Sequence, residues 1–499
     1  MVTPHGIKFA VHIITKDFGN LVAKVCEYLF SHGPLTLDQL VRHTELTNEQ
    51  VKNSLLVLIQ HNCAQPFVSA PQEGADDEAG KLRVGTQYLV LFDNILHRLR
   101  FPKFLEIVSS KFNDECVDIL KGLLRDGRLT LKQMVDRASQ GKENAVATSV
   151  VRESLCKLLT AQVVERCPAT EPVVSTVFKE ETTTKKLGSK AAKISEAPQT
   201  IEQRVLEAAV PGEAIRFSFT ADTGCKADGE ANSDDTQVTS TGENVAKEEE
   251  ILWCANFEEF IRHLRHKVLF ESVRTKYDDG TATVLSAILE ATRTIEKKVK
   301  MESSVPLSLD TVITEVMKTE AGRTMTADRI QASLGHDRLG CSQKMIIHDA
   351  YSIDLKKIIE HARNEEVESI VLKRYGRDAH RIFRLLSKDN CFHDTDQIAA
   401  KTLVDKREVP KLLYKLWKDN YLHVEKVLVP GPKLSAYTLM WKVNKALLWE
   451  CVLDEMYHVA LNLSSRMYVE HEKDKELLSV PKDKLLMKLD DALMLFHDF

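Results

Sequence analysis

Apolar residues recur at helical spacing between Arg377 and Val443, and their pattern predicts three short helices. The first helix has one apolar face, formed by Ala379, Ile382, Phe383 and Leu386. A second helix is predicted over Thr395–Ala400, with Ile398 and Ala399 facing inward. The third is predicted to begin at Asp405, a good N-cap with Glu408 three residues later. Its predicted apolar face comprises Val409, Leu412, Leu413, Leu416 and Trp417.

The remainder of this stretch predicts a β-hairpin. Tyr421–Val429 and Ala436–Val443 have the composition of strands, and Pro430-Gly431-Pro432 between them forces a turn. Three helices followed by a hairpin form a winged helix, which is a helix-turn-helix with a β-wing.

Basic residues cover the solvent side of two helices in this unit. The predicted third helix carries Lys406, Arg407, Lys411, Lys415 and Lys418, and the first carries Arg377, Arg381, Arg384 and Lys388. The third helix of a winged helix enters the major groove, and cationic side chains there bind phosphates without specifying sequence. We therefore predict that these residues form a DNA-binding surface. The sequence leaves open a second interpretation, in which they form a solvated face or a face for acidic partner subunits.

The same plan recurs earlier in the chain. Gly33–Val41 (GPLTLDQLV) is echoed by Gly127–Val135 (GRLTLKQMV), and Pro306–Ile313 (PLSLDTVI) repeats the pattern. The unit described above is the fourth copy, because Asp405–Asn420 aligns with Thr47–Asn62. Self-similarity of this kind marks a duplicated unit, so we predict four tandem winged helices in a mainly α fold with small β-hairpins.

The first copy shows where its elements are expected. Thr47–Asn62 predicts its third helix, capped by Thr47 with Gln50, and Cys63–Val68 predicts the first wing strand. The acidic stretch Glu73–Gly80 is expected to form a loose wing tip. Tyr88–Leu99 predicts a helix that leads into the second copy.

Two segments separate or follow the copies. Residues 179–250 are rich in Thr, Ser, Ala, Asp and Glu, which predicts a largely disordered linker. Ile251–Trp253 and Phe257–Phe270 then predict the helical start of an elaborated third unit, which includes a long helix over Thr281–Val299. The tail predicts two helices, with Pro481 breaking the second. Its first helix is predicted to have a mixed seam of Leu447, Leu448, Cys451, Val452, Glu455 and Val459.

These segments define the predicted domain organisation. It comprises winged helix 1 over 1–100, winged helix 2 over 101–178, the linker over 179–250, winged helix 3 over 251–350, winged helix 4 over 351–443, and a C-terminal helical hairpin or coiled coil over 444–499.

Composition limits the class of protein. The chain has 499 residues, which predicts several domains, and its net charge of −5 means that nucleic-acid contacts depend on local patches. Its ten cysteines contain no CxxC pair, which argues against a zinc ribbon and for reduced thiols in an intracellular protein. No apolar run approaches the ~18 residues of a membrane span, and the first nine residues lack the order of a signal peptide.

Catalytic and cofactor motifs are not found in the sequence. There is no GxxxxGK[ST], no helix-opening GxGxxG, no HExxH and no GxSxG. His263 and His266 are spaced i, i+3, but no acidic or cysteine partner follows at metal spacing, so a solvated surface is expected. We predict no catalytic residues, no cofactor and no metal site.

Several local sequences together resemble a known family, the third-largest subunit of RNA polymerase III, which is related to the alpha subunit of TFIIE. They are His12–Ile14 with Asp17–Gly19, Val57–Asn62, Leu99–Phe104, Val164–Pro168, Arg374–Arg377, Arg381–Leu385 and Leu413–Leu416. The resemblance covers nearly the whole chain apart from the linker. It implies four winged helices and a C-terminal coiled coil.

The resemblance also implies a function. It implies a nuclear, non-catalytic, peripheral subunit on the clamp of the RNA polymerase III core, held with two smaller heterotrimer subunits. Such a subunit recruits the enzyme to promoters of small RNA genes (5S rRNA, tRNA) through the initiation factor TFIIIB and aids promoter DNA opening. The alternative is a winged-helix scaffold of another assembly, of proteasome-lid or trafficking type, without a DNA role. Neither function involves a membrane or a small-molecule substrate.

Overall fold

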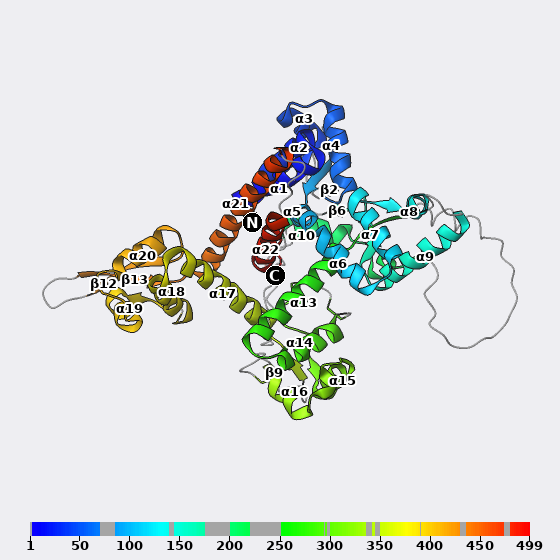
Figure 1. Ribbon diagram of the computed structural model, residues 1–499. Helices are drawn as coiled ribbons and strands as arrows, with labels where there is room; N and C mark the ends of the chain where they lie inside the picture. The colour runs from blue at the N-terminus through cyan, green and yellow to red at the C-terminus, as the bar shows by residue number, and fades with distance from the viewer. Residues whose placement is uncertain are drawn as a thin grey trace, which may run out of the picture. The chain divides into compact units, whose positions relative to one another are not determined.

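The computed structural model describes most of the chain in two compact bodies. The described residues are 2–69, 85–138, 144–174, 200–219, 251–293, 295–296, 300–335, 342–344, 350–389, 391–429, 436–473 and 480–499. One body comprises Ala10–Phe260, and the other comprises Met1–Phe9 with Ile261–Phe499. Each body is shown as a ribbon in Figure 1.

Four small sheets share one topology. In each, the strand that follows the first helix pairs with the last strand, which in turn pairs with the middle strand: β1-β3-β2, β4-β7-β5, β8-β10-β9 and β11-β13-β12. Three helices with this sheet form a winged helix. The predicted mainly helical, tandem winged-helix fold is confirmed.

Two winged units lie in the body Ala10–Phe260. The first comprises α2 Asn20–His32, β1 Leu35–Thr36, α3 Leu37–Thr44, α4 Asn48–Gln60, β2 Ala64–Ser69 and β3 Thr86–Val90. The second comprises α7 Asp114–Asp126, β4 Leu129–Thr130, α8 Leu131–Ala138, α9 Asn144–Thr160, β5 Val164–Arg166 and β7 Leu252–Ala255.

Two more winged units lie in the other body. The third comprises α14 Asp279–Thr292, β8 Leu307–Ser308, α15 Leu309–Lys318, α16 Ala327–Ser333, β9 Ser342–Lys344 and β10 Ala350–Ser352. The fourth comprises α18 Arg377–Asp389, β11 His393–Asp394, α19 Thr395–Thr402, α20 Val409–Lys418, β12 His423–Val429 and β13 Ala436–Lys442.

A capped second helix explains why the repeated sequence folds alike in each unit. The side chain at its N-cap accepts a hydrogen bond from the amide three residues on, which satisfies one of the free donors of the first turn. This residue is Thr36, Thr130, Ser308 or Asp394 in the four units in turn. The adjacent two-residue strand pairs with the last strand of its own sheet.

The last wing strand differs from prediction in the first two units. Tyr88 lies in strand β3, so the predicted helix Tyr88–Leu99 is wrong in its first part, and helix α5 spans only Phe92–His97. Strand β7 contains Trp253 and completes the sheet of the second unit, where the sequence predicted the helical start of the third. Asn94 and Asn256, which follow the two strands, each donate an amide hydrogen bond of 2.8 Å to the carbonyl of the left-handed residue after the third helix.

Part of the predicted disordered linker is ordered. Residues 200–219 form α10 Ile201–Ala209 and α11 Glu213–Arg216, and β6 Val173–Val174 pairs in parallel with β2. Val205 of α10 packs in a buried cluster with Phe67, Leu89, Leu91 and Val174. Phe219 stacks on Trp253 with ring centroids 5.9 Å apart, so this segment packs on both units of its body. The remaining linker residues lie outside the described ranges.

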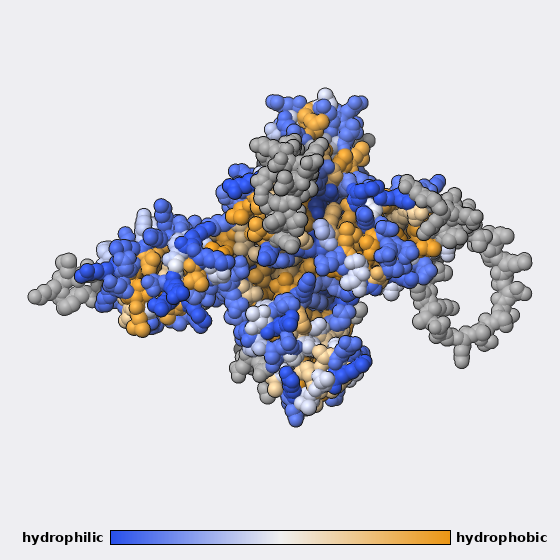
Figure 2. Space-filling model, in the orientation of Figure 1, coloured by the Kyte–Doolittle hydropathy of each residue, from blue (hydrophilic) through white to orange (hydrophobic). Residues whose placement is uncertain are grey.

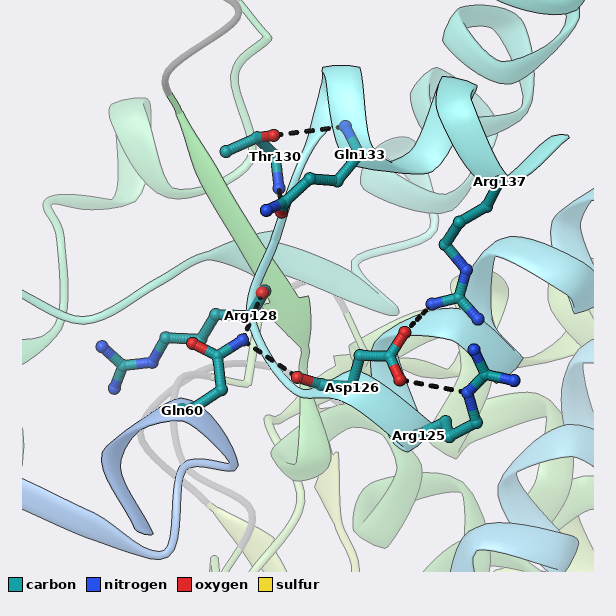
Figure 3. Close-up of polar contacts among 7 residues, drawn as sticks. All are labelled: Gln60, Arg125, Asp126, Arg128, Thr130, Gln133 and Arg137. Atoms are coloured by element: carbon teal, nitrogen blue, oxygen red, sulfur yellow. Dashed lines mark hydrogen bonds and ion pairs between the residues drawn. The ribbon is translucent and has the colours of Figure 1, made fainter. Parts of the chain in front are cut away.

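The junction between the first two units is polar and close. The Gln60 side-chain amide, at the end of α4, donates to the carbonyls of Asp126 (2.9 Å) and Arg128 (2.6 Å), as Figure 3 shows. The Arg128 backbone amide donates to the Gln60 carbonyl at 3.0 Å. Gly127 between them has φ +80°, and a Cβ there would lie 2.0 Å from the Gln60 carbonyl oxygen. The conformation of the α7–β4 turn therefore sets how closely α4 approaches it.

The other described elements precede, link or follow the four units. They are α1 Pro4–Phe18, a 3₁₀ turn at Arg98–Arg100, α6 Phe101–Lys111, α13 Phe257–Lys276, a 3₁₀ turn at Gly322–Thr324, α17 Leu355–Tyr375, α21 Lys445–Lys473 and α22 Val480–His497. Helix α14 ends at Thr292, seven residues before the predicted end, and Ile295 beyond it is exposed. No helix in the described residues is long and apolar enough to cross a membrane.

The tail forms two packed helices, with a seam that differs from prediction. Leu447 and Val459 of α21 are exposed, and the buried positions are Leu448, Val452, Met456, Tyr457 and Ala460. Both seams recur about every four residues, and Met456 and Ala460 of the buried seam lie one position beyond the predicted Glu455 and Val459. Pro481 lies in the first turn of α22 and does not break it, because the first-turn amides have no acceptor within the helix. The N-terminus also contacts α21: the His5 ring lies 2.7 Å from the Asp454 carboxylate.

Candidate nucleic-acid interface

The fourth winged unit contains every residue of the predicted DNA-binding surface. Its core is formed by the predicted apolar positions of α18, because Ala379, Ile382, Phe383 and Leu386 are buried. The predicted hairpin is present as β12 and β13, and the turn Pro430–Pro432 lies outside the described residues. The Trp441 indole N–H of β13 donates to the Thr395 hydroxyl at 3.2 Å, which joins the hairpin to α19.

The third helix begins later than predicted. Helix α20 starts at Val409, and the capping pair of Asp405 and Glu408 does not form. The Asp405 carboxylate instead accepts from the Arg407 amide at 3.1 Å, within a turn over 405–408. Pro410 fits the first turn, where its missing N–H costs no intrahelical bond. Lys406 and Arg407 therefore lie in the turn before the helix.

Helix α20 buries one face and exposes a mixed aromatic and basic face. Val409, Leu413 and Leu416 are buried as predicted, but Trp417, predicted to face inward, is 42% exposed. Trp417 instead contacts Tyr414, which is 57% exposed, with ring centroids 5.7 Å apart. The apolar pattern of the sequence did not place these two aromatic residues on the surface. Their i, i+3 spacing among the lysines of this helix was the signal in the sequence that could have placed them on the exposed face.

The lysines of α20 differ in how their charge is balanced. The Lys411 ammonium lies 2.8 Å from the Glu408 carboxylate, and this hydrogen bond raises the pKa of Lys411. Within the described ranges, Lys415 and Lys418 form no ion pair, and both are exposed. Asp419, the nearest carboxylate in sequence to Lys418, accepts a hydrogen bond from the Tyr375 hydroxyl. The C-terminal half of α20 therefore presents two lysines without an ion-pair partner among the described residues.

The basic residues of α18 form a separate stripe. Arg377, Arg381, Arg384 and Lys388 recur at i, i+4, i+7 and i+11, opposite the buried face, and all are exposed. Arg381 pairs with Asp378 at 3.5 Å, and Arg384 lies 3.8 Å from Glu368 of α17. The basic residues of 406–418 lie on α20 and in the turn before it, and α20 packs against α18.

The lysines of the first two winged units are weaker candidates for DNA contact. On α9, Lys157 pairs with Glu153 at 2.8 Å, and the Arg152 guanidinium lies 5.1 Å from the Phe219 ring centroid. On α4, Glu49 precedes the exposed Lys52 by three residues. Of the third helices in these units and the fourth, α20 has the least compensated charge.

The wing of the fourth unit carries exposed apolar residues. They are Val427, Leu428, Tyr437 and Leu439, near the end of the hairpin away from the core. Figure 2 shows hydrophobic residues interspersed with hydrophilic ones on the surface of this unit. Scattered exposed apolar side chains are ordinary, but a group of them on a protruding hairpin is typical of a protein contact.

The histidine pair on α13 does not lie on a fully solvated surface. His263 and His266 are both partly buried, whereas the sequence predicted a solvated face. No cluster of metal-ligating side chains in the described residues includes either one.

The fold and the basic helix define the chain first as a tandem winged-helix protein. Three family models match it: the helix-turn-helix domain of RNA polymerase III subunit RPC82 over residues 8–69, RNA polymerase III subunit RPC82 over 153–345, and the C-terminal winged-helix domain of POLR3C over 367–438. All three describe one subunit, and together they cover more than half of the chain. The chain belongs to the RPC3 (RPC82) family of RNA polymerase III subunits.

Curated relatives agree over nearly the full length. The chain is 22% identical to DNA-directed RNA polymerase III subunit RPC3 of Danio rerio over 504 residues, which covers 96% of this chain and 86% of the relative. Identity to the Homo sapiens subunit of the same name is 22% over 496 residues, with the same coverage. The Dictyostelium discoideum subunit is 32% identical over 184 residues, covering 33% of this chain and 27% of the relative.

Proposed function

We propose that the chain is a non-catalytic, peripheral subunit of RNA polymerase III that contacts promoter DNA through α20 during initiation at small RNA genes. The observation that carries the DNA contact is that Lys415 and Lys418 are exposed and form no ion pair within the described part of the chain, beside Lys411 on the third helix of a winged helix. That helix is the element which winged helices insert into DNA.

The proposed contact is with the sugar–phosphate backbone. Lysine ammonium groups bind phosphates as point charges, whereas base readout relies on planar bidentate groups such as those of Arg, Asn and Gln. The exposed face of α20 offers lysines, Tyr414 and Trp417, and none of those bidentate groups. Such a surface holds promoter DNA near the polymerase without selecting its sequence. This suits a subunit that recruits the enzyme to promoters and aids their opening.

The proposed partners follow from the family. They are the RNA polymerase III core and clamp, two smaller heterotrimer subunits, the initiation factor TFIIIB and promoter DNA, all in the nucleus. The family's relatives are named as RNA polymerase III subunits. The compensated charge on α4 and α9 supports protein contacts, and not DNA contacts, for the first two winged units.

A gel-shift titration tests the DNA contact. The purified full chain is titrated onto duplex DNA at several salt concentrations, as wild type and with Lys411, Lys415 and Lys418 changed to Ala. Removing one phosphate contact should lower the slope of log K against log[salt] by about 0.9. We expect weaker binding on every DNA sequence and a shallower slope.

A matched control separates local contact from net charge. Changing Lys52, Lys132 and Lys157 to Ala removes the same charge from exposed positions of the first two units. We expect this variant to bind like the wild type. If both triple variants behave alike, or if the α20 variant keeps its affinity and salt slope, α20 does not bind DNA.

A further inference from the structure

A cluster of three different metal-ligating side chains lies between the end of α18 and β11. Asp389, Cys391 and His393 place one ligand atom each within 4.8 Å of the other two. We propose that these residues bind a divalent transition-metal ion of the zinc class. The prediction of no metal site rested on the absence of known motifs such as CxxC. These three residues have a different spacing, D-x-C-x-H.

The distances between donor atoms fit a tetrahedral ion. The His393 Nε2 lies 3.0 Å from the Asp389 carboxylate oxygen and 3.4 Å from the Cys391 Sγ. Zinc bonds of ordinary length with tetrahedral angles separate oxygen from nitrogen by about 3.3 Å and nitrogen from sulfur by about 3.6 Å. These two separations are therefore within a few tenths of an ångström of those around one ion, and the third pair of donors lies within 4.8 Å.

The histidine is held in position by the fold. His393 is only 5% exposed, and its strand pairs with Trp441 of β13. Its Nδ1 lies 3.4 Å from the Gln397 amide oxygen of α19, which can accept the Nδ1 proton when an ion replaces the proton on Nε2. A hydrogen bond to the second ring nitrogen is the usual support of a metal-bound histidine.

The donor set indicates the kind of ion. Thiolate, imidazole and carboxylate together suit Zn²⁺ and its neighbours, whereas Mg²⁺ and Ca²⁺ prefer oxygen ligands alone. Within the described residues the cluster has no fourth member, so water or an added ligand completes the tetrahedron. Lys401 lies 3.4 Å from the Asp389 carboxylate and competes with the ion, but its side chain is 48% exposed and is able to turn away.

Metal binding would tie the last turn of the first helix to the first strand of the fourth winged unit. The site uses none of the lysines of α20, so it stands independently of the proposed DNA contact. It would make the stability of this unit depend on metal, because an ion that binds only the folded form stabilises it by mass action.

Residue-resolved thiol alkylation tests the site in the full chain. The protein is treated with iodoacetamide with and without added Zn²⁺, and the alkylated peptides are quantified by mass spectrometry. Because the free thiolate is the nucleophile, a bound ion should slow alkylation of Cys391 about tenfold or more. Cys156, an exposed thiol on α9, is the internal control and should react at the same rate in both conditions.

Variants and a second metal make the test decisive. Asp389→Asn alters an exposed ligand without touching the core, and it should abolish most of the protection. Co²⁺ added to the wild type should give thiolate-to-metal absorption bands that Cys391→Ser removes, while His423→Gln keeps them. Equal alkylation of Cys391 with and without Zn²⁺, or protection that survives Asp389→Asn unchanged, would overturn the proposal.

Discussion

Gly33 and Gly127 occupy the same position in the first and second winged units but have different surroundings. Both have positive φ, +78° and +80°, in a region that L-residues rarely adopt. A Cβ on Gly33 would meet nothing within 4 Å, whereas one on Gly127 would meet the backbone of Gln60. The repeat in the sequence reveals the shared backbone requirement. It does not reveal the contact, because Gln60 lies in another winged unit.

This pair gives a matched prediction. Gly33→Ala should cost about 1–3 kcal/mol through backbone strain alone. Gly127→Ala should cost more, because the methyl group also forces α4 away from the α7–β4 turn. Hydrogen exchange should then be faster in the peptide around Gln60 for Gly127→Ala than for Gly33→Ala. Equal exchange rates in the two variants would show that the close approach of Gln60 to Gly127 does not affect the stability of this junction.

Other single residues mark the limit of sequence reasoning. Thr47 caps its helix as predicted, because a cap and its partner lie three residues apart and need no tertiary information. Trp417 is exposed although it extends the apolar pattern of α20, because burial depends on what packs against a helix. The nine predicted basic residues are all exposed, but the sequence did not indicate which carry unbalanced charge.

At the scale of elements, the helices were more predictable than the strands. The third helices of the first and fourth units were recognisable from a 3.6-residue period, but each sheet contains a two-residue strand too short to show any period. The last strand of the second unit was missed for a different reason. Strand β7 pairs with β5 although the sequence from Cys167 to Glu250 separates them, and reasoning from local pattern does not join such distant segments.

We predict that the stability of the junction between α1, α4, α7 and the 3₁₀ turn at Arg98 depends on pH. His61 lies just after α4, and burial, followed by the charge of Arg98, lowers the pKa of His61 to about 4, although Asp126 and Asp17 act in the opposite direction. An unfolded histidine titrates near pH 6.5. Between pH 6.5 and 4 the unfolded chain therefore binds a proton that the folded chain does not, so acid destabilises the junction in this window.

Replacing the histidine removes this dependence. Between pH 7 and pH 5, acid should open the junction less in His61→Gln than in the wild type. His32→Gln, which changes an exposed histidine of α2, should behave like the wild type. The measurement is hydrogen exchange of the peptide covering Gln60–Ala64 at the two pH values. If the wild type and His61→Gln open equally with acid, His61 does not control the junction.

The whole molecule is a series of similar modules with different surfaces. All four winged units share a sheet order and a capped second helix, which a duplicated sequence explains. Their exposed faces differ: α9 pairs its lysine with a glutamate, whereas α20 leaves Lys415 and Lys418 unpaired among the described residues. The fold is therefore common to all four units, and the proposed DNA contact belongs to one of them.

Site-specific photocrosslinking tests this assignment most directly. A photoreactive residue is placed at Lys415 on α20, Lys52 on α4 or Lys157 on α9, and each full chain is assembled with RNA polymerase III and its initiation factor on promoter DNA. We predict crosslinks to DNA from position 415, and crosslinks to protein alone from positions 52 and 157. Crosslinks from position 415 only to protein, or equal DNA crosslinks from all three positions, would contradict the account.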